Sequence, residues 1–127
     1  MKISHVAMWV KDMENIKDFY MKYFNCKCND KYINNKKCFE SYFLSFEDNS
    51  KLEIMNIKDI KESNKENNFY GFAHIAISVG SKDKVDIITK ILEDDGYTVA
   101  SNPRTTGDGY YESVILDPEN NKIEITI

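Results

Sequence analysis

The sequence predicts an α+β fold in which two copies of a β-α-β-β-β module form one small domain. Two observations predict it. An internal repeat spans most of the chain, and the hydrophobic periodicity changes from that of a strand to that of a helix and back in both copies. With 127 residues, the chain is long enough to bury a core but too short for two large independent domains.

The repeat is clearest in two pairs of segments. Residues 5–10 (HVAMWV) parallel residues 74–79 (HIAISV) at an offset of 69, and residues 48–54 (DNSKLEI) parallel residues 119–125 (ENNKIEI) at an offset of 71. The matches occur in the same order with nearly the same offset. They indicate two modules, at 1–57 and 71–127, joined by a polar linker over 58–70.

The elements of the first module follow from local signals. Alternating apolar residues predict a strand over 2–10. Asp12 is a suitable N-cap for a helix over 13–24, where apolar residues recur at i, i+3, i+4 and i+7, and Asn25 tolerates the left-handed conformation that ends a helix. Three more strands are expected, at 26–33, 38–47 and 51–56.

The second module repeats this order. A strand is expected over 71–79, and Ser81 is the N-cap of a helix over 82–95 that Gly96 ends. The remaining strands are expected at 97–101, 109–116 and 122–127. Residues 100–109 contain Pro103 and two glycines, and we expect them to form an irregular segment that folds over a site as a lid.

Composition excludes several classes of protein. The net charge is −4 without a basic cluster, which argues against nucleic-acid binding. No apolar run approaches the roughly 20 residues that cross a bilayer, so no membrane segment is expected. The chain shows no basic and apolar secretion signal, and its three cysteines are an odd number for a disulfide framework, so a cytoplasmic location is expected.

Four residues stand out because the period of two in a strand places them on one face. In each module one face of these strands is apolar and can pack against a helix. His5 and Glu53 lie on the other face of the first module, and His74 and Glu124 on the other face of the second. A histidine followed by a glutamate thus recurs at separations of 48 and 50 residues. The repeat makes a metal site a better explanation than four unrelated polar residues.

The chemistry of these side chains agrees with a divalent metal. A buried carboxylate must be paired, protonated or bound to a cation. Two imidazoles and two carboxylates neutralise one divalent ion and leave coordination positions for water or substrate. Nickel or zinc is the expected ion, cobalt, iron and manganese are also acceptable, and calcium and magnesium suit imidazole less well.

At these residues the chain resembles the vicinal-oxygen-chelate superfamily, which contains glyoxalase I, bleomycin-resistance proteins and extradiol dioxygenases. Residues 5–12 with Phe19-Tyr20 resemble the family's opening strand and helix. Residues 71–79 resemble the opening of its second module, and residues 116–125 resemble its closing hairpin. The resemblance implies paired βαβββ modules that form an open, cup-shaped barrel around a metal, and it implies a homodimer.

The order His, Glu, His, Glu is similar to the ligand set of glyoxalase I. The resemblance and the repeat together imply that Glu124 is the catalytic base and that Glu53 is its counterpart. Glu40 and Glu112, which a weaker repeat at an offset of 72 pairs, are alternative bases if the reaction is an epimerisation. Glyoxalase I commonly has an arginine near the end of its first strand, where this chain has Trp9 and Lys11, so glutathione is not implied as the thiol.

Three residues are candidates for substrate binding. Arg104 is the single arginine, and its guanidinium can hold a carboxylate or phosphate through two hydrogen bonds, although it can equally be an exposed loop charge. Trp9 and Tyr110 are candidates for the pocket wall. Tyr111 remains an alternative to Tyr110, because a bulge at Gly109 would exchange the faces of the two.

Three classes of function follow. The first is a glyoxalase I-like lyase or isomerase acting on the hemithioacetal of a 2-oxoaldehyde and a thiol. The second is another metalloenzyme of the same superfamily, either a fosfomycin-type thiol transferase or an epimerase. The third is a non-catalytic protein that binds a small molecule, as resistance proteins do, and the four-ligand pattern disfavours it.

Overall fold

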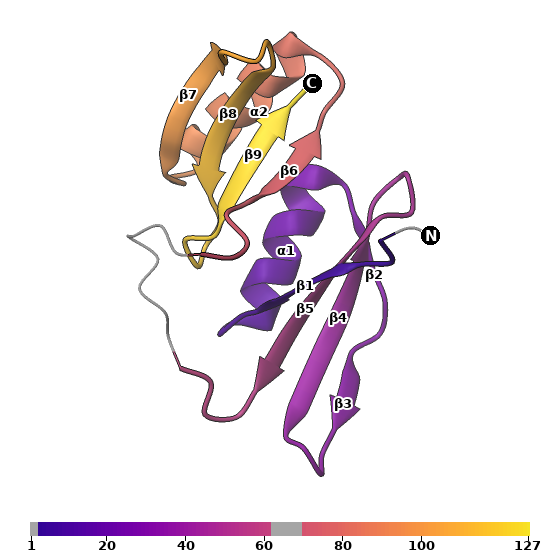
Figure 1. Ribbon diagram of the computed structural model, residues 1–127. Helices are drawn as coiled ribbons and strands as arrows, with labels where there is room; N and C mark the ends of the chain where they lie inside the picture. The colour runs from indigo at the N-terminus through magenta and orange to yellow at the C-terminus, as the bar shows by residue number, and fades with distance from the viewer. Residues whose placement is uncertain (1–2, 62–69) are drawn as a thin grey trace. The chain divides into compact units, whose positions relative to one another are not determined.

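The computed structural model describes residues 3–61 and 70–127. It forms two compact units, Met1–Ser63 and Asn64–Ile127. Each unit has one helix against one open sheet, which confirms the α+β class and the two βαβββ modules (Figure 1). The predicted linker lies largely outside the described residues.

The first unit contains one helix and five strands, with these bounds: β1 (Val6–Trp9), α1 (Met13–Phe24), β2 (Lys27–Cys28), β3 (Tyr32–Asn34), β4 (Phe39–Ser45) and β5 (Lys51–Ile57). The sheet order is β1-β5-β4-β2, and β3 also pairs with β4. β1 is parallel to β5, and β4 is antiparallel to it. The strand predicted over 26–33 is therefore two short strands. Asn29 separates them, because its side chain accepts a hydrogen bond from the backbone of Phe43 at 2.6 Å.

The second unit contains one helix and four strands, with these bounds: β6 (Ile75–Ser78), α2 (Lys82–Asp94), β7 (Val99–Thr105), β8 (Tyr111–Leu116) and β9 (Lys122–Thr126). The sheet order is β6-β9-β8-β7. β6 is parallel to β9, as β1 is to β5. Both opening strands are shorter than the predicted strands at 2–10 and 71–79.

The lid predicted over 100–109 is wrong for most of its length. Residues up to Thr105 belong to β7, and only the turn between Thr106 and Tyr110 is irregular. Pro103 is compatible with this strand because β7 is at the edge of the sheet. The register with β8 also shifts between Ser101 and Arg104, where a residue without an N–H group is tolerated.

The helices begin and end where local chemistry predicts. The Asp12 side chain accepts a hydrogen bond from the Asn15 amide, and Ser81 does the same for Lys84. α1 ends at Asn25, whose φ of 51° is left-handed, and Gly96 after α2 has a φ of 90°. These caps are confirmed.

Apolar side chains of each helix pack against one face of its own sheet. In the first unit, Ile16 and Tyr20 of α1 are fully buried, as are Leu44 and Ile54 of the sheet. In the second unit the buried core consists of these residues from α2, β8 and β9: Val85, Leu92, Ile115, Ile123 and Ile125. The opposite face of each sheet carries the histidine and the glutamate.

The internal repeat extends to individual backbone hydrogen bonds. In the turn after β4, Phe46 donates to Ser50 at 3.0 Å, and in the turn after β8, Asp117 donates to Asn121 at 2.9 Å. Val10 donates to Met55, and Val79 donates to Thr126, both at 2.8 Å. The two halves therefore place equivalent residues at equivalent positions of their sheets.

A charged cluster joins α1 to its sheet and makes stability depend on pH. Glu14 accepts hydrogen bonds from Lys17, from Lys31 at 2.8 Å and from the Tyr42 hydroxyl at 2.8 Å. The two ammonium groups and the hydroxyl lower the pKa of Glu14 to about 2. A carboxylate whose pKa is lower in the folded state contributes stability that is complete above pH 4.5 and is lost as the pH falls towards 2.

We expect Glu14→Gln to lower the free energy of unfolding by about 1 kcal/mol at pH 7, because solvent screens the half-exposed carboxylate. The difference from the wild type should shrink below pH 4.5 and almost vanish at about pH 2. Urea unfolding followed by circular dichroism at several pH values measures this. Glu47→Gln, in the exposed turn after β4, is the control and should change stability by less than about 0.5 kcal/mol at every pH. A Glu14 effect that does not vary with pH would contradict the assignment.

Candidate metal and substrate site

Sheet register determines the face on which each candidate side chain lies. Glu53 of β5 pairs with Ala7 of β1 on one side and with Phe43 of β4 on the other. Its neighbours Leu52 and Ile54 are buried on the side of α1. Because side chains alternate along a strand, Glu53 lies on the face opposite α1. We call this surface of each sheet its ligand face.

His5 and Glu53 form the first pair on the ligand face of unit 1. His5 precedes Ala7 by two residues, so it lies beside Glu53, and its Nε2 is 3.5 Å from Glu53 Oε2. The histidine side chain is 39% exposed and the glutamate side chain is 14% exposed. The Phe43 ring contacts the imidazole edge-to-face, with 5.4 Å between ring centroids. This contact holds the imidazole next to the carboxylate.

His74 and Glu124 form an equivalent pair in unit 2. Glu124 pairs with Ala76, two residues after His74, exactly as Glu53 pairs with Ala7. Nε2 of His74 is again 3.5 Å from Oε2 of Glu124, and the exposed fractions of the two side chains are 45% and 19%. The structure therefore brings the four predicted ligands together two by two, one pair in each unit.

The spacing within each pair fits two ligands of one ion. Nitrogen and oxygen ligands lie about 2.0–2.2 Å from a divalent ion such as zinc, so two neighbouring ligands are about 3.0–3.5 Å apart. A separation of 3.5 Å is long for a direct N–H···O hydrogen bond. Within residues 3–61 and 70–127, no group of three or more His, Cys, Asp or Glu side chains is placed to hold a metal. Each unit by itself thus places two of the four predicted ligands side by side.

A second carboxylate lies beside Glu124. Glu112 of β8 is buried and lies on the ligand face, because Val114, two residues later, pairs with Glu124. Burial and then the negative charge of Glu124 raise the pKa of Glu112. Arg104 opposes these effects, with Nη2 3.5 Å from the Glu112 carboxylate.

Arg104 is held on the ligand face of unit 2 from two sides. It pairs with Glu112 across β7 and β8, and its Nη1 donates to the Ser101 hydroxyl at 2.7 Å. The side chain is still 49% exposed, so part of the guanidinium is free to meet solvent or a ligand. It is a strand residue and not an unsupported loop charge.

The equivalence expected between Glu40 and Glu112 is wrong. The sheets align at an offset of 71, since Ser41 pairs with Met55 as Glu112 pairs with Thr126, so Ser41 is the counterpart of Glu112. Glu40 lies on the helix side of its sheet, 3.4 Å from Lys31. The sequence match has an offset of 72, one residue more than the offset of the sheets. A shift of one residue exchanges the two faces of a strand, so the match assigned Glu40 to the wrong face.

The ligand face of unit 1 is aromatic. Trp9 lies on it and is 46% exposed, and its ring meets Phe39 edge-to-face with 6.2 Å between centroids. Phe39 in turn contacts Tyr32 at 6.1 Å. Sequence reasoning identified Trp9 but missed Phe39 and Phe43, because aromatic residues in β4 occur on both faces. Only their pairing with β5 distinguishes the faces.

The two candidate tyrosines differ in their surroundings. The Tyr111 hydroxyl donates to Asp86 of α2 at 2.7 Å, so Tyr111 is on the helix side. Tyr110 precedes β8 in the turn and is exposed. Tyr111 is therefore not available as a wall of the ligand face, and Tyr110 stays a candidate.

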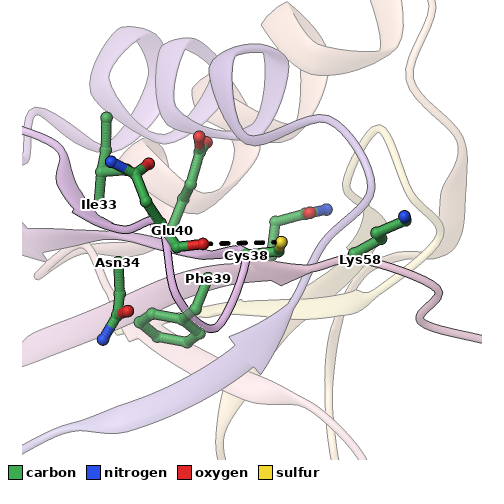
Figure 2. Close-up of a pocket in the computed structure, with 8 residues that line it drawn as sticks. Ile33, Asn34, Cys38, Phe39, Glu40 and Lys58 are labelled. Atoms are coloured by element: carbon green, nitrogen blue, oxygen red, sulfur yellow. Dashed lines mark hydrogen bonds between the residues drawn. The ribbon is translucent and has the colours of Figure 1, made fainter.

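A shallow open pocket of about 390 Å³ lies in the first unit, around the turn between β3 and β4. The thiol of Cys38 donates to the Asn35 carbonyl at 3.8 Å in this turn. Figure 2 shows that its labelled side chains do not converge, because Asn34 and Phe39 point to one side of the strands and Glu40 to the other. The pocket includes Phe39, whose ring contacts Trp9 and Tyr32, but it does not include the His5–Glu53 pair.

Neither helix of the described chain is long and apolar enough to cross a membrane.

No protein with a curated description matches the sequence. Solved structures do match the fold. A glyoxylase/bleomycin resistance protein/dioxygenase domain from Frankia sp. EAN1pec has a TM-score of 0.83 at 14% identity, over 100% of this chain and 97% of that one.

Two glyoxalase I structures are also similar. The enzyme from Zea mays has a TM-score of 0.81 at 19% identity, over 98% of this chain, which spans 44% of the maize protein. The trypanothione-dependent enzyme from Leishmania major has a TM-score of 0.79 at 17% identity, over 99% of this chain and 86% of that one. Likenesses at such identities show the fold.

The sequence itself shows the family. Residues 2–125 match the profile of the Glyoxalase/Bleomycin resistance protein/Dioxygenase superfamily. This match includes both βαβββ units and all four residues of the His–Glu pairs. The chain belongs to the Glyoxalase/Bleomycin resistance protein/Dioxygenase superfamily.

Proposed function

We propose that this protein is a divalent-metal-dependent lyase or isomerase of the glyoxalase I type. Its substrate would be the hemithioacetal of a 2-oxoaldehyde and a thiol, and its product an α-hydroxy thioester. The observation that carries the proposal is the equivalence of the two His–Glu pairs. They have the same residue types, the same 3.5 Å separation and the same position in the sheet register.

We propose that His5, Glu53, His74 and Glu124 hold the metal together, either within one chain or across a homodimer. The chain has only two histidines, so a site that takes two imidazole ligands from one chain must use both. Zinc or nickel suits this mixed nitrogen and oxygen set. A bound divalent ion would supply Lewis-acid stabilisation of negative charge on a carbonyl and a neighbouring hydroxyl oxygen.

The chain's own carboxylates would move the proton. Glu124 removes the proton from the carbon that bears sulfur and hydroxyl, and returns it to the neighbouring carbonyl carbon. The reaction is an isomerisation, so it balances without another reactant. Glu53 is the counterpart of Glu124 in the first unit. In this proposal Arg104 binds a negatively charged group of the substrate, while Trp9 and Tyr110 line the pocket.

An epimerase is the second candidate, and the position of Glu112 favours it. An epimerisation uses an acid and a base that exchange a proton with one carbon, and Glu112 is a second carboxylate beside Glu124. Burial keeps more of Glu112 protonated than an exposed carboxyl group, which suits an acid.

The proposal is tested by metal content and product together. We expect purified protein loaded with zinc or nickel to retain the metal through gel filtration, to melt at a higher temperature than metal-free protein, and to form lactoyl thioester from methylglyoxal and a low-molecular-weight thiol. Elemental analysis, thermal unfolding and mass spectrometry of the product measure these. The double variant His5→Ala/His74→Ala is the control. Wild type that neither retains metal nor gains thermal stability would refute the proposal.

A further inference from the structure

The ligand face of unit 1 carries three neighbouring aromatic side chains. We call this group, Tyr32, Phe39 and Trp9, the aromatic surface. Its rings form a continuous edge-to-face chain, with centroid distances of 6.2 Å from Trp9 to Phe39 and 6.1 Å from Phe39 to Tyr32. Trp9 is 46% exposed and Tyr32 is 53% exposed. A cluster of large exposed rings is uncommon unless it binds something.

The aromatic surface is continuous with the His5–Glu53 pair. Trp9 pairs with Met55 and Phe39 pairs with Ile57, so both lie on the same face as Glu53 and further along β5. Successive residues on one face of a strand are about 7 Å apart, so a substituent of ring size on a molecule held beside Glu53 would reach Trp9. This continuity indicates a small molecule anchored at the His–Glu pair as the occupant.

The two ligand faces differ in polarity. In unit 2, Glu112 lies beside Glu124 and Arg104 lies beside Glu112, whereas aromatic rings lie beside Glu53 in unit 1. A methyl group is too small to cover the rings of Trp9 and Phe39. An aromatic substituent covers them and meets them in the edge-to-face or offset geometry that rings prefer.

We infer that Trp9 and Phe39 bind an aromatic substituent on the carbon chain of the substrate, so that the preferred substrate is an aryl-substituted vicinal oxygen compound. This inference rests on the proposed metal-dependent function, because it assumes that the oxygens are held beside Glu53. It adds the substrate class, which the metal ligands alone do not specify.

Mandelate and lactate test the inference as a matched pair of probes. Both carry a hydroxyl next to a carboxylate, and they differ in a phenyl group against a methyl group. We expect zinc-loaded wild-type protein to bind mandelate roughly ten times more tightly than lactate in isothermal titration calorimetry. Trp9 is the only tryptophan, so mandelate should also change its fluorescence, and lactate should change it little.

Variants of Trp9 distinguish the contact with the phenyl group of mandelate from the binding of its oxygens to the metal. Trp9→Ala should bind mandelate and lactate with nearly equal affinity, and Trp9→Phe should recover part of the preference for mandelate. Tyr70→Ala, at an exposed tyrosine that precedes β6, is the control and should retain the full preference. Circular dichroism and zinc content confirm that each variant is folded and loaded.

The possible failures are distinguishable. Equal affinity of wild type for the two acids would overturn the inference and leave the proposed function standing. Trp9 emission that acrylamide cannot quench in the ligand-free protein would show that protein covers the surface, and would also overturn it. If zinc does not bind, or if neither acid binds the zinc-loaded protein more tightly than the metal-free protein, the proposed function itself fails and the inference fails with it.

Discussion

Replacing Glu124 by glutamine is expected to lower kcat for hemithioacetal isomerisation by roughly a thousandfold. The amide has the shape of the carboxylate but cannot accept the proton from carbon, and its oxygen is still able to ligate a metal. The loss should therefore appear in kcat, with metal content close to that of the wild type. Steady-state kinetics on metal-loaded protein, with elemental analysis of the same sample, measure both quantities.

Glu93→Gln is the matched control for this variant. It makes the same change in the same unit, at an exposed position on α2 that pairs with Lys90. Its kcat should equal that of the wild type. Glu53→Gln tests which half of the repeat supplies the base, because a larger loss there than at Glu124 would exchange the two roles. Metal-loaded Glu124→Gln that keeps kcat within threefold of the wild type would show that neither the base nor its position has been identified.

Replacing His74 by alanine is expected to weaken zinc binding by about a hundredfold to a thousandfold. Four ligands of a zinc site together contribute on the order of 10–16 kcal/mol, so one of them accounts for about 3 kcal/mol. His5→Ala should have a similar effect, because the two pairs are equivalent in distance and register. Competition with a chromophoric chelator measures the affinities. An unchanged affinity in either variant would exclude that histidine from the site.

The same two variants distinguish a site within one chain from a site shared by two chains. If each site combines His5 of one protomer with His74 of another, a mixed dimer of His5→Ala and His74→Ala chains regains one site with both histidines. Unfolding and refolding the two variants together should then restore metal binding that neither has alone. If each site lies within one chain, the mixture stays as weak as its components.

The order of elements and the helix caps of this protein could be predicted from the residues alone. Periods of 3.6 and 2 distinguish helix from strand, and Asp12, Asn25, Ser81 and Gly96 carry the local chemistry of helix ends. These signals act over a few residues, so no tertiary contact was needed to interpret them. The pairing of His5 with Glu53 and of His74 with Glu124 was predicted from the repeat, because a duplicated module places equivalent residues in equivalent positions.

The remaining features depended on sheet register, which a single strand does not contain. The pairing of β8 with β9 places Glu112 beside Glu124, whereas the sequence match had aligned Glu112 with Glu40, which lies on the helix side. Most of the segment that was predicted to be a lid belongs to β7, because an edge strand accommodates Pro103. Strand partners are distant in sequence, and a shift of one residue exchanges the two faces. The sequence by itself therefore determined the duplicated fold and the types of its candidate ligands, and only the tertiary structure decided which side chains lie around them.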